Sequence, residues 1–120
     1  MFSSKENVNN LTAMLISAGI KDIVVCPGSR NAVLVHNFYE ASLLWKSFRL
    51  HSITDERSAS FFAIGIWLAT RKPVAICVTS GSALLNTIPG VAEACYRHIP
   101  LVIISADRPP QWIGQLDGQT

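Results

Sequence analysis

The sequence predicts an α/β domain of three layers, in which helices cover both faces of a mostly parallel sheet. Three observations lead to this fold class. Short β-branched segments alternate with helical segments of ten or more residues, a pattern typical of right-handed crossovers between parallel strands. The last two strand segments are continuously apolar, as expected for strands covered on both faces. The 120 residues are 49% hydrophobic, which provides one domain with a single core.

The elements follow from the spacing of apolar residues along the chain. Gly19 ends the first helical pattern, Pro27 and Gly28 end the first strand, and Pro73 precedes the third strand. No closing strand or helix follows residue 105, so we expect a domain that is truncated at its C-terminal end. The predicted helices cover residues 7–19, 31–42, 56–70 and 82–97, and the predicted strands cover residues 23–26, 47–53, 74–78 and 101–105.

Charge, apolar run length and cysteine content exclude several classes of protein. Ten basic and eight acidic residues are spread along the chain, unlike the basic stripe of a nucleic-acid-binding protein. No apolar run reaches the roughly 18 residues that a membrane span needs, and residues 1–7 are polar, unlike a signal peptide. A cytoplasmic location is therefore expected. Three cysteines without metal-ligand spacing favour reduced thiols and no metal site in this chain.

Four polar or glycine-rich segments follow the predicted strands. Open parallel sheets bind their ligands at this edge. Each segment alone also fits a structural role, such as a turn, a helix cap at Ser29 or Asn31, or a turn from Asp107 to Arg108. Four such segments at one edge favour a ligand site. They are Pro27-Gly28-Ser29-Arg30, Thr54-Asp55-Glu56-Arg57, Thr79-Ser80-Gly81-Ser82 and Ala106-Asp107-Arg108-Pro109-Pro110.

The residue types in these segments indicate what they could bind. Residues 27–30 combine free N–H groups, a helix N-terminus, a hydroxyl and a guanidinium, which together suit an anion. Gly81 permits close approach of the backbone to a ligand. Glu56 begins an otherwise apolar helix, so we expect its carboxylate to face a dry interface in which hydrogen bonds are strong. Two prolines after Arg108 hold that residue in an extended segment at the sheet edge. The glycine spacing of dinucleotide and P-loop sites and the Gly-x-Ser-x-Gly motif of hydrolases do not occur here.

Together these segments resemble one family of enzymes. The order and spacing of Cys26-Pro27-Gly28-Ser29-Arg30, Asp55-Glu56-Arg57, Val78-Thr79-Ser80-Gly81-Ser82 and Ala106-Asp107-Arg108-Pro109-Pro110 resemble the 2-succinyl-5-enolpyruvyl-6-hydroxy-3-cyclohexene-1-carboxylate synthases. These are thiamin-diphosphate enzymes of menaquinone biosynthesis. The resemblance implies the thiamin-diphosphate-binding fold, with residues 1–120 forming an incomplete N-terminal pyrimidine-binding domain. The middle and diphosphate-binding domains are absent from this chain.

The resemblance also implies roles for individual residues. Glu56 is the implied catalytic residue: its carboxylate hydrogen-bonds the aminopyrimidine ring and favours the imino tautomer, whose nitrogen then takes the C2 proton of the thiazolium to give the ylid. Cofactor contacts are implied for Pro27, Glu56, Thr79, Ser80 and Gly81, and substrate contacts for Ser29, Arg30, Arg108 and Gln119.

The implied reaction is a transfer between two small molecules. The enzyme decarboxylates 2-oxoglutarate and adds the resulting succinyl carbanion equivalent to isochorismate. Its cofactors are thiamin diphosphate and Mg²⁺ or Mn²⁺, with metal ligands outside this chain. In the family the cofactor lies between two subunits of a homodimer or tetramer, so this chain alone is expected to be inactive. Two alternatives remain open: the pyrimidine domain of another thiamin-diphosphate carboligase or decarboxylase, and a non-catalytic α/β ligand-binding module.

Overall fold

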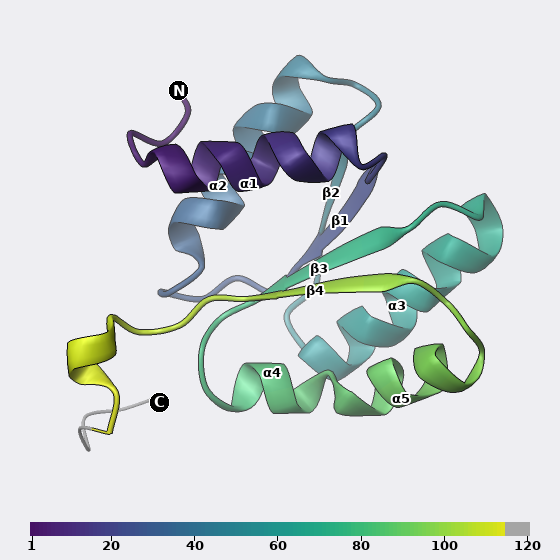
Figure 1. Cartoon of the computed structure of the whole chain (residues 1–120). Helices are drawn as coiled ribbons and strands as arrows, with labels where there is room; N and C mark the ends of the chain where they lie inside the picture. Colours follow the sequence, from purple (N-terminus) through teal and green to yellow (C-terminus); the bar gives the residue numbers. More distant parts are fainter. Residues whose placement is uncertain (115–120) are drawn as a thin grey trace.

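Four parallel strands form the sheet at the centre of the computed structural model, which describes residues 1–114 (Figure 1). Their order across the sheet is β2-β1-β3-β4, and each neighbouring pair is parallel. The parallel sheet confirms the predicted fold class, and each strand lies within or overlaps a segment predicted from its apolar residues. The strands are β1 (Asp22–Val25), β2 (Arg49–Ser52), β3 (Val74–Val78) and β4 (Leu101–Ser105).

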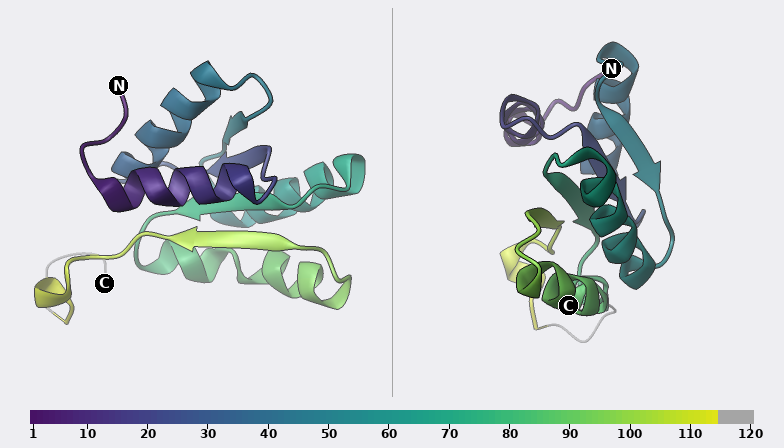
Figure 2. Two further views of the ribbon diagram at one scale, coloured as in Figure 1. Left: turned by 45° about the horizontal axis from the view of Figure 1, so that its top comes forward. Right: turned by 90° about the vertical axis from the view of Figure 1, so that its right-hand side faces the viewer.

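Helices cover both faces of this sheet and complete the three layers (Figure 2). The first two helices pack on one face and the next three on the other, and a short 3-10 helix follows β4. Within residues 1–114, no helix combines the length and the apolar character that crossing a membrane requires. The helices are α1 (Glu6–Ser17), α2 (Ala32–Leu44), α3 (Glu56–Thr70), α4 (Ser82–Asn86), α5 (Ile88–Tyr96) and η1 (Pro110–Trp112).

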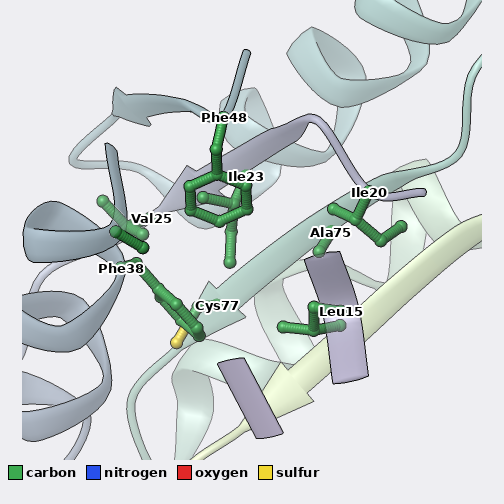
Figure 3. Packing of buried hydrophobic residues seen from close by; sticks show 9 residues of the cluster. Leu15, Ile20, Ile23, Val25, Phe38, Phe48, Ala75 and Cys77 are labelled. Carbon is green, nitrogen blue, oxygen red and sulfur yellow. The ribbon is translucent and has the colours of Figure 1, made fainter. Parts of the chain in front are cut away.

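Side chains alternate across the central strands and build a core on each face. Ile23 and Val25 of β1 and Cys77 of β3 point toward α1 and α2, where they meet Leu15 and Phe38 (Figure 3). The intervening side chains pack on the opposite face against small, fully buried residues of α3, which let that helix approach the sheet closely. This second core includes Val24, Ile76, Val78, Ala59 and Ala63.

The helix predicted over residues 82–97 is interrupted at Thr87. α4 ends at Asn86 and α5 begins at Ile88, with Pro89 in the first turn of α5. Proline cannot donate a backbone hydrogen bond and its ring crowds the carbonyl group four residues earlier, so a continuous helix is broken here. The Thr87 hydroxyl donates to the Leu84 carbonyl oxygen at 2.7 Å and closes the last turn of α4.

The prediction that both apolar strands are covered on both faces holds for β3 and is wrong for β4. All five residues of β3 are buried, whereas those of β4 are half-buried or exposed, and Val102 is 37% exposed. β4 lies at the edge of the sheet, where neighbouring helices cover it incompletely. An apolar run alone does not distinguish a central strand from an edge strand.

The order in which the strands are added to the sheet changes direction between β1 and β3. From β1 it passes through α2 to β2 on one side, and from β2 it passes through α3 to β3 on the other side. Such a switch point opens a crevice at the carboxyl ends of the two adjacent strands, where open α/β sheets bind ligands. The predicted segments 27–30 and 79–82 follow these two strand ends.

Candidate active site

Hydrogen bonds join the loop after β1 to the loop after β3 at this switch point. The Asn31 side chain is fully buried, accepts from Gly28 N at 2.8 Å and donates to the Cys26 carbonyl oxygen at 3.0 Å. Arg30 N donates to Thr79 Oγ1 at 3.3 Å. Asn31 was considered above as a helix cap, but its side chain makes no capping hydrogen bond to α2 and instead shapes the preceding loop.

Two glycines of the predicted segments are required by the geometry of these loops. A Cβ atom placed on Gly28 would lie 2.6 Å from Thr79 Cβ, so any other residue would push the two loops apart. Gly81 has φ 78° and ψ −139°, a conformation that side-chain-bearing residues rarely adopt, and it directly precedes α4. Both glycines therefore let the loops at the ends of β1 and β3 pack closely.

Glu56 lies at the same edge, as the first residue of α3. The helix begins with Asp55 as its cap, whose carboxylate accepts from Ser58 N at 2.8 Å. Hydrogen bonds from the Ser58 hydroxyl and from its backbone N–H hold the pKa of Asp55 below its ordinary value. The Glu56 side chain is half-buried, and its Oε2 accepts from Asn86 Nδ2 at 2.9 Å.

The loop after β1 lies within electrostatic reach of Glu56. Burial raises the pKa of the Cys26 thiol to about 12, and the nearby negative charge of Glu56 adds to this effect. Cys26 is 1% exposed, so the thiol stays protonated beside the carboxylate. This proximity joins the segment around Pro27 to the start of α3.

The two predicted arginines lie on the side of the site nearest β4. The Arg30 guanidinium lies over the Trp112 ring, 5.7 Å from its centroid. An open hollow of about 310 Å³ borders Arg30, and Lys5 and Ser105 are among its lining residues. Arg108 is buried, and its backbone N–H donates to Asp107 Oδ1 at 2.7 Å.

Comparison with known proteins identifies the family. Residues 7–120 match the family described as "Thiamine pyrophosphate enzyme, N-terminal TPP binding domain". The chain belongs to this family. Over all 120 residues it is 55% identical to the "2-succinyl-5-enolpyruvyl-6-hydroxy-3-cyclohexene-1-carboxylate synthase" of Phocaeicola vulgatus and 53% identical to that of Bacteroides thetaiotaomicron. It is 47% identical over 119 residues to the enzyme of the same name from Porphyromonas gingivalis. The chain covers 20–21% of the length of these three relatives.

Two polar groups of this thiamine pyrophosphate-binding domain lack a hydrogen-bond partner among residues 1–114. Glu56 Oε2 is bound to Asn86, while Oε1 of the same carboxylate has no hydrogen-bond partner among residues 1–114. Ser80 Oγ is fully buried and also lacks a hydrogen-bond partner within that range. Thr79 differs, because its hydroxyl already accepts from Arg30 N. Pro27 and Ser29 are solvent-exposed on the loop after β1.

Within the described part of this thiamine pyrophosphate-binding domain, no group of three or more His, Cys, Asp or Glu side chains could hold a metal. Gln119 lies outside the described residues. The structure therefore brings together Glu56 with the segments around Pro27 and Ser80, and it places Arg30 and Arg108 beyond them toward β4.

Three residues that shape the site were not among the predicted site residues. They are Asn31, Asn86 and Trp112, which contact the loop after β1, the Glu56 carboxylate and the Arg30 guanidinium, respectively. Asn31 directly follows a predicted segment, which was a usable signal. Asn86 and Trp112 carry no local sequence signal, because their contacts depend on how distant elements meet.

Proposed function

We propose that the chain is the N-terminal, pyrimidine-binding part of a 2-succinyl-5-enolpyruvyl-6-hydroxy-3-cyclohexene-1-carboxylate synthase. The observation that carries this proposal is the 55% identity to such an enzyme over all 120 residues. The complete enzyme decarboxylates 2-oxoglutarate and adds the succinyl unit to isochorismate in menaquinone biosynthesis. The middle and diphosphate-binding domains of that enzyme, with the Mg²⁺ ligands, lie outside this chain, which alone is inactive.

Glu56 is the catalytic residue of this part of the enzyme. When bound, thiamin diphosphate supplies the electron sink that stabilises a carbanion. The Glu56 carboxylate shares a proton at its free Oε1 with the pyrimidine ring. Partial burial strengthens that hydrogen bond, since fewer water molecules compete for the carboxylate. Pro27, Thr79, Ser80 and Gly81 form the wall of the pyrimidine site.

Cationic and polar groups toward β4 recognise the substrates. 2-Oxoglutarate and isochorismate each carry two carboxylates, for which arginine is a suitable partner because its planar fork donates two parallel hydrogen bonds. Ser29, Arg30, Arg108 and Gln119 contact the acidic acceptor in this proposal. The position of Arg30 beside an open hollow supports its role, since a ligand can reach the guanidinium.

The complete enzyme is a cytoplasmic homo-oligomer in this proposal. Exposed apolar side chains on the helices beside the site support a partner subunit there, because large exposed apolar patches mark interaction surfaces. These side chains include Phe61 and Phe62 of α3, Leu84 and Leu85 of α4, and Ile88 of α5.

The test is the substitution Glu56→Gln in the whole protein. With thiamin diphosphate, Mg²⁺ and 2-oxoglutarate supplied, we expect the wild type to consume isochorismate and the variant to be at least about 100-fold slower, as for loss of a positioned proton-transfer group. Glu93→Gln is the matched control. Glu93 is an exposed carboxylate on α5 paired with Arg97, so its variant should keep the full rate.

Each other outcome favours a different function. A wild type that binds thiamin diphosphate but does not consume isochorismate belongs to another carboligase or decarboxylase. A wild type that does not bind the cofactor at all is a non-catalytic ligand-binding module. Equal rates for wild type and Glu56→Gln would remove Glu56 from the mechanism.

A further inference from the structure

Asn86 joins the two acidic residues at the start of α3. Its Nδ2 donates to Glu56 Oε2 at 2.9 Å and to Asp55 Oδ1 at 3.1 Å. The amide nitrogen of asparagine carries two hydrogens, so one hydrogen serves each carboxylate. The partners are 30 and 31 residues away along the chain, and the contact bridges α4 and α3.

The place of Asn86 is set by the break between α4 and α5. α4 ends at Asn86 because Pro89 prevents a continuous helix, and Thr87 closes the last turn through its bond to Leu84. α4 itself starts at the loop after β3, which contains Ser80 and Gly81. The short helix thus extends from the loop after β3 to the first turn of α3, where Asn86 at its end supplies a neutral hydrogen-bond donor.

The two hydrogen bonds orient the Glu56 carboxylate. A glutamate side chain has three rotatable torsions, and an exposed one samples many orientations. Here Oε2 is fixed by Asn86, and among residues 1–114 no partner occupies Oε1. Asp55 is anchored separately by Ser58, so Asn86 is the only described side chain that hydrogen-bonds Glu56.

We propose that Asn86 is a positioning residue for Glu56: it holds Oε2 so that Oε1 is presented to the aminopyrimidine of thiamin diphosphate. This inference rests on the proposed function, since it assigns Asn86 a role at the same site. A neutral amide is required, because a carboxylate at position 86 would repel both partners. In an Asn86→Asp variant the introduced carboxyl is protonated at low pH, and it then again donates one hydrogen bond.

The experiment measures thiamin diphosphate affinity of the whole protein by calorimetry, with Mg²⁺, between pH 5 and pH 8. We expect Asn86→Ala to bind about tenfold or more weakly at every pH, as for loss of a hydrogen bond to a charged group. Asn86→Asp should bind still more weakly at pH 8 and recover part of its affinity toward pH 5. Asn10→Asp is the control for added charge, since Asn10 is exposed on α1, and it should match the wild type throughout.

A purely structural role of Asn86 predicts another result. Both variants would then unfold at a lower temperature, yet bind the cofactor with wild-type affinity below that temperature and without the added pH dependence. That result overturns the inference and leaves the proposed function intact. A wild type that does not bind thiamin diphosphate overturns the proposed function and this inference with it. If Asn86→Ala does not fold, the pH dependence of the isosteric Asn86→Asp decides alone.

Discussion

Uncharged polar side chains hold the candidate site together at the residue scale. Asn31, Thr79 and Asn86 each join segments that are distant along the chain, and the Arg30–Thr79 bond spans 49 residues. Neutral donors and acceptors can be buried at lower cost than charges once they are paired. The loops are therefore fixed by hydrogen bonds that leave Oε1 of Glu56 for a ligand.

Ser80 provides a prediction that separates a structural hydroxyl from a binding one. Its Oγ is buried without a hydrogen-bond partner among residues 1–114, and such a group destabilises the free protein by about 1 kcal/mol or more. We expect Ser80→Ala to unfold at the same or a higher temperature than the wild type. If the hydroxyl bonds the cofactor, the same variant should bind thiamin diphosphate about tenfold more weakly.

Calorimetry with and without the cofactor measures both effects in the whole protein. Ser82→Ala is the control, because Ser82 is exposed at the start of α4 and its removal should change neither quantity appreciably. A Ser80→Ala variant that is less stable and binds the cofactor normally would show that the hydroxyl serves the fold.

Sequence alone identifies site residues whose chemistry is unusual for their local setting. Glu56 is visible because it begins an apolar helix, and Arg108 because two prolines follow it. Asn86 has no such contrast: its role arises only when α4 ends above the first turn of α3. Hydrogen bonds of neutral side chains across about 30 residues depend on the tertiary packing, which residue patterns do not encode locally.

Strands and helices were predictable to different degrees at the element scale. β3 and β4 coincide with predicted residues 74–78 and 101–105, because apolar β-branched runs between turn residues define a strand well. The break at Thr87 was missed, since apolar spacing continues through it and only Pro89 marks it. The exposure of β4 was missed because strand order is a property of the whole sheet.

β1 and β2 are joined by an ion pair between a buried carboxylate and a half-exposed guanidinium at the ends opposite the site, and this pair gives a prediction for stability. Asp22 is 2% exposed and accepts from Arg49 Nε at 2.8 Å and Nη2 at 2.7 Å, while His51 Nε2 lies 2.8 Å from its carboxylate. Burial alone raises the pKa of Asp22, but the hydrogen bonds from Arg49 and His51 outweigh it and keep the pKa below the ordinary value of 3.8. We expect Asp22→Asn to lower the free energy of unfolding at pH 7 by about 2 kcal/mol.

The pH dependence of this effect follows from the direction of the shift. A carboxyl with a lowered pKa in the folded state adds stability that is complete above pH 3.8 and is lost as the pH falls through its lower folded value. Urea unfolding should therefore show a constant difference between wild type and Asp22→Asn from pH 7 to about pH 5, and a smaller one at pH 3. Glu93→Gln removes an exposed pair and should cost less than about 0.5 kcal/mol. A difference that grows on acidification would contradict the assigned ion pair.

Across the whole molecule, the site is open on the side of α4. Glu56 and Asn86 lie beside the exposed apolar side chains of this helix, among which Leu85 is 64% exposed. A partner domain that covers these side chains would also remove water from the Glu56 carboxylate. Association and cofactor binding should therefore be coupled if the complete enzyme assembles through this surface.

Leu85→Asp in the whole protein tests that coupling. A charge at the centre of a buried apolar contact weakens association by about 2 kcal/mol or more, which is about 30-fold in the dissociation constant. We expect light scattering to detect dissociation at a higher protein concentration than for the wild type, and calorimetry to show weaker thiamin diphosphate binding under the same dilution. Leu44→Asp is the matched control, because Leu44 is also 64% exposed but ends α2 on the opposite face of the sheet. Equal losses in both variants would mean that added charge, and not the α4 surface, weakens the assembly. Unchanged assembly in Leu85→Asp would place the partner domain elsewhere, and the Glu56 carboxylate would then have to function in contact with solvent.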